Sequence, residues 1–395
     1  MRTDDSGGRT RTSLPLIVKG ELMATTCGMT TPVRGSVWRA WGRALLGGAV
    51  MACALGAGNA LGEALARLLG AEGYLRQLLP AALVSALAVP AVLGLRAMRS
   101  TRRCPMGLGP RSSAPLGFLR GLAVTASCAA LALGAGTALG WVRWSALDPA
   151  ALASFLVGNA LVAVLLEALP EEATLRGYAW ASLRDRLGGV ISALGTTAVF
   201  LLVPAASTVA QTGVSRLVGV AAPPMGLTPA GQDPIAYLVL LSVFGLTLLA
   251  ARTAPGSAPL WVAIGTHVAF LSVNRVVFEG VQRGAGWSAK VAPAHAAVLE
   301  LGYLAATAMV FVGARVVSSW VRVWVRVRVR AQRRGPGRPA AATTHSAGVW
   351  TGAGPRLVPA GREWPSAVGR EWPSAVGREW PSHDRGARII RRGDV

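Results

Sequence analysis

The sequence is poor in charge, since Asp, Glu, Lys and Arg make up only 15% of its 395 residues. Soluble domains carry about a quarter of charged residues, so this shortage excludes an ordinary soluble globular protein. Apolar residues account for 52% of the chain, and glycine alone contributes 48 residues. Small residues allow membrane helices to pack closely, so the composition points to a membrane protein.

Acidic residues and lysine are also scarce. There are 18 Asp and Glu against 40 Lys and Arg, and only Lys19 and Lys290 are lysines. A nucleic-acid-binding protein would carry its basic residues on a folded polar surface, whereas here they gather in the N-terminal arm, short loops and the C-terminal tail. We therefore expect no nucleic-acid partner, and we attribute the Arg, Ala, Gly and Pro excess to a GC-rich bacterial genome.

Cysteine is the third scarcity, and it limits the cofactor predictions. Four cysteines occur and none of them forms a CxxC pair, which gives no basis for a disulfide framework or a cysteine metal site.

What the sequence has in abundance is long apolar runs. A membrane-spanning helix needs about 20 residues, and the runs predict spans near residues 44–69, 77–98, 117–142, 150–170, 188–209, 234–252, 258–279 and 291–319. The predicted fold is an all-α, polytopic membrane protein with about eight transmembrane helices. Arginines cluster at 96–111, after the fourth run and in the tail, so the positive-inside rule predicts cytoplasmic termini in a multi-pass protein of the cell membrane.

The apolar runs divide the chain into five parts. Residues 1–42 form a polar arm expected to be disordered, 43–149 hold three transmembrane helices, 150–279 form a core with the chemical motifs, 280–319 hold the last helix, and 320–395 form a basic, disordered tail. The tail begins with VRVWVRVRVR, which alternates like a strand. Because it follows a membrane helix directly, we favour a juxtamembrane extension that binds anionic lipid headgroups. Three near-copies of GREWPSAV then follow, and their Pro and Gly favour disorder.

The fourth run ends in a group of charges, with Glu167, Glu171, Glu172 and Arg176 within ten residues. Charged groups inside a span are costly and are functional candidates by default. Glu172 and Arg176 are spaced for an ion pair on a helix, which leaves Glu171 on a neighbouring face. Glu167 and Glu171 are one turn apart, and two carboxylates that close do not both ionise easily, which suits a general base for water. The alternative is a helix end among headgroups with a surface salt bridge.

A histidine in the seventh run is the second candidate. His267 lies about nine residues into that helix, at a depth that should match Glu171. Asn274 lies two turns further along the same face. The alternative is a histidine that only bonds to a neighbouring helix.

These motifs resemble a known family. EEATLRG matches the E-E-x-x-x-R signature of the CPBP (Abi, CAAX-protease-like) intramembrane endopeptidases, whose F-x-x-x-H and H-x-x-x-N motifs follow in the same order as Phe200 and His267 do here. The resemblance covers roughly residues 150–275. It implies that Glu171 activates water, that Glu172 and Arg176 are structural or polarising partners, and that His267 holds water or stabilises an oxyanion.

Two positions depart from the family motifs. Pro204 stands where the second motif has histidine, and Leu271 stands where the third has asparagine, so that Asn274 is the nearest asparagine. The nearby stand-ins for the missing histidine are Ser207, Thr208 and Gln211. A zinc site needs about three protein ligands, and Glu171 and His267 supply two, so no cofactor is expected with confidence and zinc would be under-liganded. His295 with Glu300 could approach the site from the last helix.

Three hypotheses follow for function. The first is an intramembrane endopeptidase that cuts a membrane-associated peptide or protein, with membrane lipid as its other partner. The second is a catalytically impaired relative, with Pro204 in place of histidine, that acts as a membrane scaffold or immunity protein. The third is a proton-coupled transporter that uses Glu171 and His267 as a relay. The substrate and the oligomeric state stay open.

Overall fold

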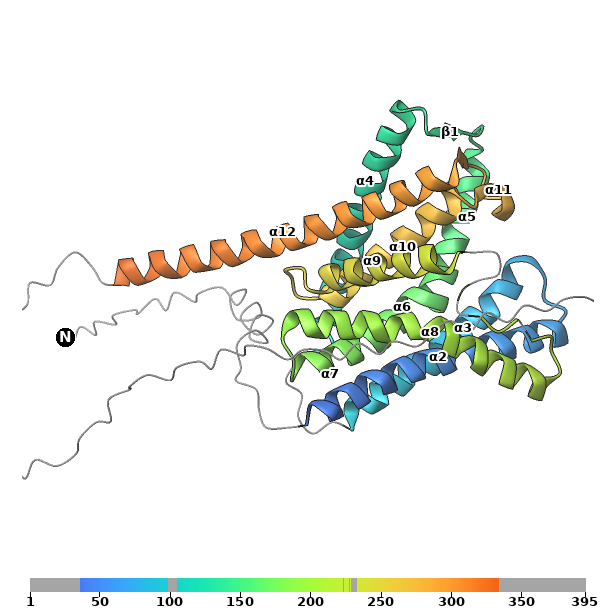
Figure 1. The fold of residues 1–395 in the computed structure, drawn as a ribbon, viewed down its shortest axis with the longest axis horizontal. Coiled ribbons are helices and arrows are strands. Elements are labelled where there is room, and N and C mark those ends of the chain that lie inside the picture. Colours follow the sequence, from blue (N-terminus) through green and yellow to red (C-terminus); the bar gives the residue numbers. More distant parts are fainter. Residues whose placement is uncertain (1–35, 99–104, 223, 227, 229–232, 334–395) are drawn as a thin grey trace, which may run out of the picture. The chain divides into compact units, whose positions relative to one another are not determined.

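A computed structural model describes residues 36–98, 105–222, 224–226, 228 and 233–333. Residues 1–35 of the N-terminal arm and the GREWPSAV copies lie outside these residues. The arm was predicted to extend to residue 42, which is wrong because residues 37–42 already form the first turns of a helix. Helices dominate the described part (Figure 1). Its two strands, β1 (Val142–Trp144) and β2 (Ala289–Val291), pair antiparallel and join the loop before the fourth span to the loop before the last.

Eight stretches of the described chain are long and apolar enough to cross a membrane, which confirms the predicted fold class. Seven of them centre on one helix each: α2 (Val37–Leu68), α3 (Gly73–Ala97), α4 (Ala114–Ala138), α8 (Gly189–Val218), α9 (Pro234–Arg252), α10 (Pro259–Val277) and α12 (Pro293–Arg333). The fourth span runs from Pro149 to Arg184 and consists of α5 (Pro149–Ala163), η3 (Val164–Ala168), α6 (Leu169–Glu171), η4 (Glu172–Ala179) and α7 (Trp180–Arg184).

The fourth span differs from the prediction, which ended it at residue 170. The helix continues to Arg184, and two π-helical segments, η3 and η4, flank Pro170. Proline has no backbone N–H, so a regular helix loses a hydrogen bond there. The Thr174 hydroxyl donates to the Pro170 carbonyl at 2.7 Å. The charged motif therefore lies within a continuous helix instead of at its end, and π-helical turns often occur at functional sites.

The last helix also differs from the prediction, which ended it at residue 319. α12 continues without a break to Arg333, well past the end of α9 (Figure 1). The alternating Val and Arg of residues 321–330 have the period of a strand but extend a helix that is already formed. Extending a helix avoids the cost of nucleation, so the neighbouring structure outweighs the local pattern.

Glycines bring α4 and α10 into close contact. A Cβ atom on Gly121 would collide with the Val262 carbonyl, and one on Gly265 would collide with the Phe118 carbonyl. Such contacts between small residues are how membrane helices approach one another. They position α10, and with it His267, inside the bundle.

Candidate active site

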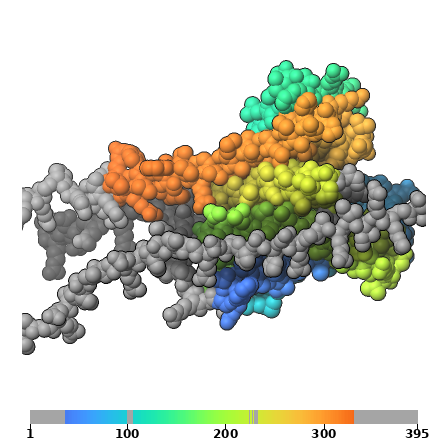
Figure 2. All heavy atoms as spheres, in the orientation of Figure 1, coloured from blue at the N-terminus to red at the C-terminus, as the bar shows by residue number. Residues whose placement is uncertain are grey.

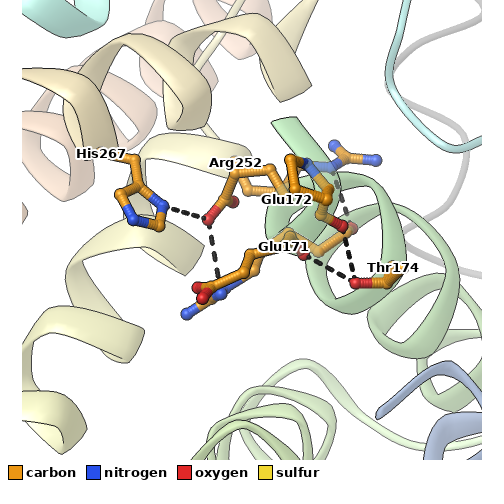
Figure 3. Close-up of polar contacts among 7 residues, drawn as sticks. Glu171, Glu172, Thr174, Arg252 and His267 are labelled. Carbon is orange, nitrogen blue, oxygen red and sulfur yellow. Dashed lines mark hydrogen bonds and ion pairs between the residues drawn. The ribbon is translucent and has the colours of Figure 1, made fainter. Parts of the chain in front are cut away.

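Glu171 is buried within the bundle but is not sealed, since 8% of its surface remains exposed. Among the described residues, no side chain or backbone group forms a hydrogen bond or ion pair with its carboxylate; the Thr174 hydroxyl reaches only its backbone carbonyl, at 3.2 Å. The charges of His267, Glu167, Arg176 and Glu172 act on it electrostatically. Figure 3 shows the side chains of Glu171 and Glu172 pointing from their helix toward α10, which carries His267. Glu171 therefore offers a carboxylate that no described group occupies.

Glu172, the next residue, is in contrast fully buried and paired. One carboxylate oxygen, Oε1, lies 3.3 Å from Nη1 of Arg176 and 3.2 Å from Nδ1 of His267. With a proton on Nδ1, the imidazole donates to this carboxylate, and its Nε2 is left for another partner. The predicted pair of Glu172 and Arg176 exists, but it lies in the interior. The alternative of a solvated helix end is therefore wrong.

Arg176 is stabilised by an aromatic ring as well as by charge. Its guanidinium lies 4.4 Å from the ring centroid of Phe200, the phenylalanine of the second motif. Its three guanidinium nitrogens form no hydrogen bond in the described structure, so Glu172 and Arg176 attract by charge without hydrogen-bond geometry. Cation–π contacts of this kind are strongest where water is excluded. The first two sequence motifs are thus joined through Arg176.

His267 is enclosed on two sides. Only 1% of the residue is exposed, and the ring of Phe244 meets the imidazole edge to face at a centroid distance of 4.9 Å. Together with the carboxylate at Nδ1, this packing leaves the ring little freedom to rotate. We expected His267 to lie at the depth of Glu171, and the structure places it in contact with Glu172, the next residue of that helix.

A second buried arginine borders the cluster, and sequence reasoning missed it. Arg252 of α9 donates from Nε to the backbone carbonyl of Arg176 at 3.3 Å and from Nη2 to the carbonyl of Pro105 at 3.0 Å. Its guanidinium stacks on Trp180. Figure 3 shows Arg252 beside the helix that carries the two glutamates. Its position at the end of an apolar run made it look like an ordinary loop cation.

Sequence reasoning also missed the partner of Glu167. Arg275, in the last turn of α10, forms an ion pair with Glu167 and donates from Nη1 to Oδ1 of Asn159 at 3.1 Å. Asn159 in turn donates to Ser272 at 3.1 Å. Arg275 compensates the charge of Glu167, so the expected repulsion between Glu167 and Glu171 is reduced. The available signal was that both residues are charged within apolar runs.

Asn274 is not brought into contact with the other predicted site residues. Its Oδ1 accepts a hydrogen bond from the Tyr303 hydroxyl at 2.6 Å. His295 stacks on Trp141, with ring centroids 4.5 Å apart, and so does not join the cluster either. The structure therefore gathers four of the five predicted residues: Glu171, Glu172, Arg176 and His267.

The residues near the missing second-motif histidine are engaged within their own helix. Ser207 donates to the carbonyl of Pro204, and Thr208 donates to the carbonyl of Ala205, each at 2.8 Å. Neither hydroxyl replaces imidazole as a base. In the described residues, no three His, Cys, Asp or Glu side chains are grouped so that they could hold a metal ion. The ligand set near Glu171 does not fit a zinc site, because Glu172 is already shared by Arg176 and His267.

Comparison with known proteins gave a match to a protein family. Residues 153–273 match the model of a family described as type II CAAX prenyl endopeptidase Rce1-like. The matched segment contains the glutamate motif, Phe200 and His267, and it agrees with the resemblance derived from the motifs. No curated protein and no solved structure matched the chain.

Proposed function

We propose that this chain, whose residues 153–273 match the Rce1-like family, is an intramembrane endopeptidase that hydrolyses a peptide bond of a membrane-associated substrate. One observation carries the proposal. Two adjacent buried glutamates have different surroundings: Glu172 is held by Arg176 and His267, while no residue that the structure describes forms a hydrogen bond or ion pair with the Glu171 carboxylate. A carboxylate that is shielded, accessible and unoccupied can bind and deprotonate water.

In the proposed reaction, Glu171 removes a proton from water as the water oxygen attacks the scissile carbonyl carbon. The proton then passes from Glu171 to the departing amine nitrogen, and the C–N bond breaks. This proton shuttle needs one carboxylate and restores it at the end of the cycle. General base catalysis of this type contributes about 10²–10⁴-fold to rate.

His267 is the proposed oxyanion donor. Glu172 fixes the imidazole through Nδ1, and Nε2, when it carries a proton, can donate to the oxygen of the tetrahedral intermediate. Arg176 balances the charge of Glu172, and Phe200 packs on Arg176. In this account, Glu172, Arg176 and Phe200 are positioning residues.

The substrate is proposed to be a peptide or protein held at the membrane, because the cluster lies within a bundle of membrane-spanning helices. The family description refers to a CAAX prenyl endopeptidase, which suggests a substrate whose lipid anchor brings its cleavage site to the bilayer. We place the protein in the cell membrane and infer no metal-dependent step from the residues present.

A second candidate is a relative that binds its substrate without cleaving it. Pro204 favours it, since it stands where the second motif has histidine, and the nearby hydroxyls of Ser207 and Thr208 donate to carbonyls of their own helix. In that case the cluster would hold the fold, and the protein would act as a membrane scaffold or immunity protein.

The two candidates are separated by comparing the termini of membrane proteins, by mass spectrometry, in cells that make wild-type protein and cells that make Glu171→Gln at matched abundance. The protease account predicts that some new termini vanish in the variant. Glu300→Gln, a change at an intramembrane glutamate of α12 outside the cluster, is the control and should retain them. Identical termini in wild type and Glu171→Gln would contradict the protease account and favour the scaffold.

A further inference from the structure

A cavity that Glu171 does not line lies at one end of the bundle. It measures about 710 Å³ and is bordered by the ends of α7 and α9, the beginnings of α8 and α10, and the second half of α12. Figure 2 shows the face on which α12 lies across α9, with α8 next to it. Four arginines line the cavity: Arg184, Arg252, Arg315 and Arg322. Its lining residues include no Asp or Glu, so the cavity is cationic.

Three of these cations lack a compensating carboxylate. Arg184, Arg315 and Arg322 form no ion pair with any residue that the structure describes. Arg184 and Arg315 are close enough for their like charges to interact. Arg252 is buried at the wall, where its hydrogen bonds go to two backbone carbonyls. Unpaired guanidinium groups gathered in one cavity favour an anion, and planar guanidinium suits phosphate.

The cavity also lies at the depth of a membrane surface. Arg184 ends the fourth span and Arg252 ends the sixth. About 20 helical residues cross the hydrocarbon core, so Arg315 follows shortly after the point where α12, starting at Pro293, has crossed it. Apolar side chains share the lining, among them Val190, Leu246 and Val312. Arginine side chains next to apolar walls can bind a ligand that carries a phosphate group on a hydrocarbon chain.

We propose that this cavity binds a phosphate-bearing anion at the membrane surface. The guanidinium groups of Arg184, Arg315 and Arg322 would contact the phosphate, and Arg252 would contribute charge from the wall. An anionic phospholipid headgroup and a free phosphate share this chemistry. Basic pockets between membrane helices are known to take lipid headgroups of this type.

The test measures ligand binding to the full-length protein in a non-ionic detergent by native mass spectrometry. The probes are phosphatidylglycerol, phosphatidylcholine and inorganic phosphate. The test variant is Arg315→Gln with Arg322→Gln, and the matched control is Arg326→Gln with Arg328→Gln. The control removes the same charge from exposed positions of the same helix that do not line the cavity.

The proposal predicts that wild type retains phosphatidylglycerol over phosphatidylcholine, and that the test variant loses about tenfold or more of this binding while the control keeps it. Binding of inorganic phosphate with the same dependence on Arg315 and Arg322 would instead identify free phosphate as the ligand. Equal losses in the two variants would show general attraction to a basic helix and overturn the proposal. Absence of binding by all three probes to wild type would also overturn it.

Discussion

Removal of the Arg176 side chain should lower the free energy of unfolding of the protein. The side chain is fully buried, and Arg176→Ala leaves the Glu172 carboxylate buried, with His267 near Oε1 and no hydrogen-bond partner at Oε2 among the described residues. Breaking a buried ion pair from one side costs about 3–5 kcal/mol. We expect the lower end, about 3 kcal/mol, because Arg176 and Glu172 lack hydrogen-bond geometry.

The chain offers a matched control for this prediction. Glu63 and Arg67 have the same spacing of four residues on a helix, but the Arg67 side chain is 51% exposed, and Glu63 also pairs with Arg76. Arg67→Ala should cost at most about 1 kcal/mol. The assay is thermal unfolding of both purified variants in detergent, with membrane abundance measured in parallel. Losses of stability that agree within about 1 kcal/mol would refute the claim that burial makes the Arg176 pair important.

Two further predictions concern packing around the site. Gly265→Val should lower membrane abundance, because a Cβ at Gly265 meets the α4 backbone. Gly134→Val should not lower it, because Gly134 faces open space on α4. Immunoblotting of membranes measures the abundance of both variants, and equal abundance would contradict the prediction. Tyr303→Phe and Asn274→Ala should each cost about 0.5–1.5 kcal/mol in thermal unfolding and leave cleavage intact, because they break one buried hydrogen bond outside the cluster. Loss of cleavage in Asn274→Ala alone would give Asn274 a catalytic role.

Most of the fold was predictable because span prediction depends on local hydropathy. A run of about 20 apolar residues is enough to indicate a helix, so the number of spans and their centres agree with the structure. The predicted ends of the fourth, fifth and last spans were wrong, because where a helix stops depends on structure that local hydropathy does not show. The buried Glu172 carboxylate in the fourth span lies 3.2 Å from Nδ1 of His267, a partner 95 positions further along the chain. Local sequence cannot show that these charges are compensated.

Contacts in the site were predictable where spacing along one helix determines them. They were not predictable where they depend on how distant helices pack together. The pair of Glu172 and Arg176 follows from a spacing of four residues, and the motif order indicated His267. The pairing of Glu167 with Arg275 and the contact of Arg252 with the Arg176 carbonyl join distant helices. In the sequence, Arg275 is a charge within an apolar run, whereas Arg252 is a cation at the end of one.

The central claim is that two adjacent glutamates have different roles, with Glu172 stabilising the fold and Glu171 left for water. The most direct measurement compares the thermal unfolding of Glu171→Gln and Glu172→Gln in the same detergent. We expect Glu171→Gln to be as stable as wild type or more stable, since it replaces a buried carboxylate that has no partner by a neutral amide, and we expect Glu172→Gln to be destabilised by several kcal/mol. Destabilisation of Glu171→Gln to the level of Glu172→Gln would make Glu171 a structural residue and contradict the account.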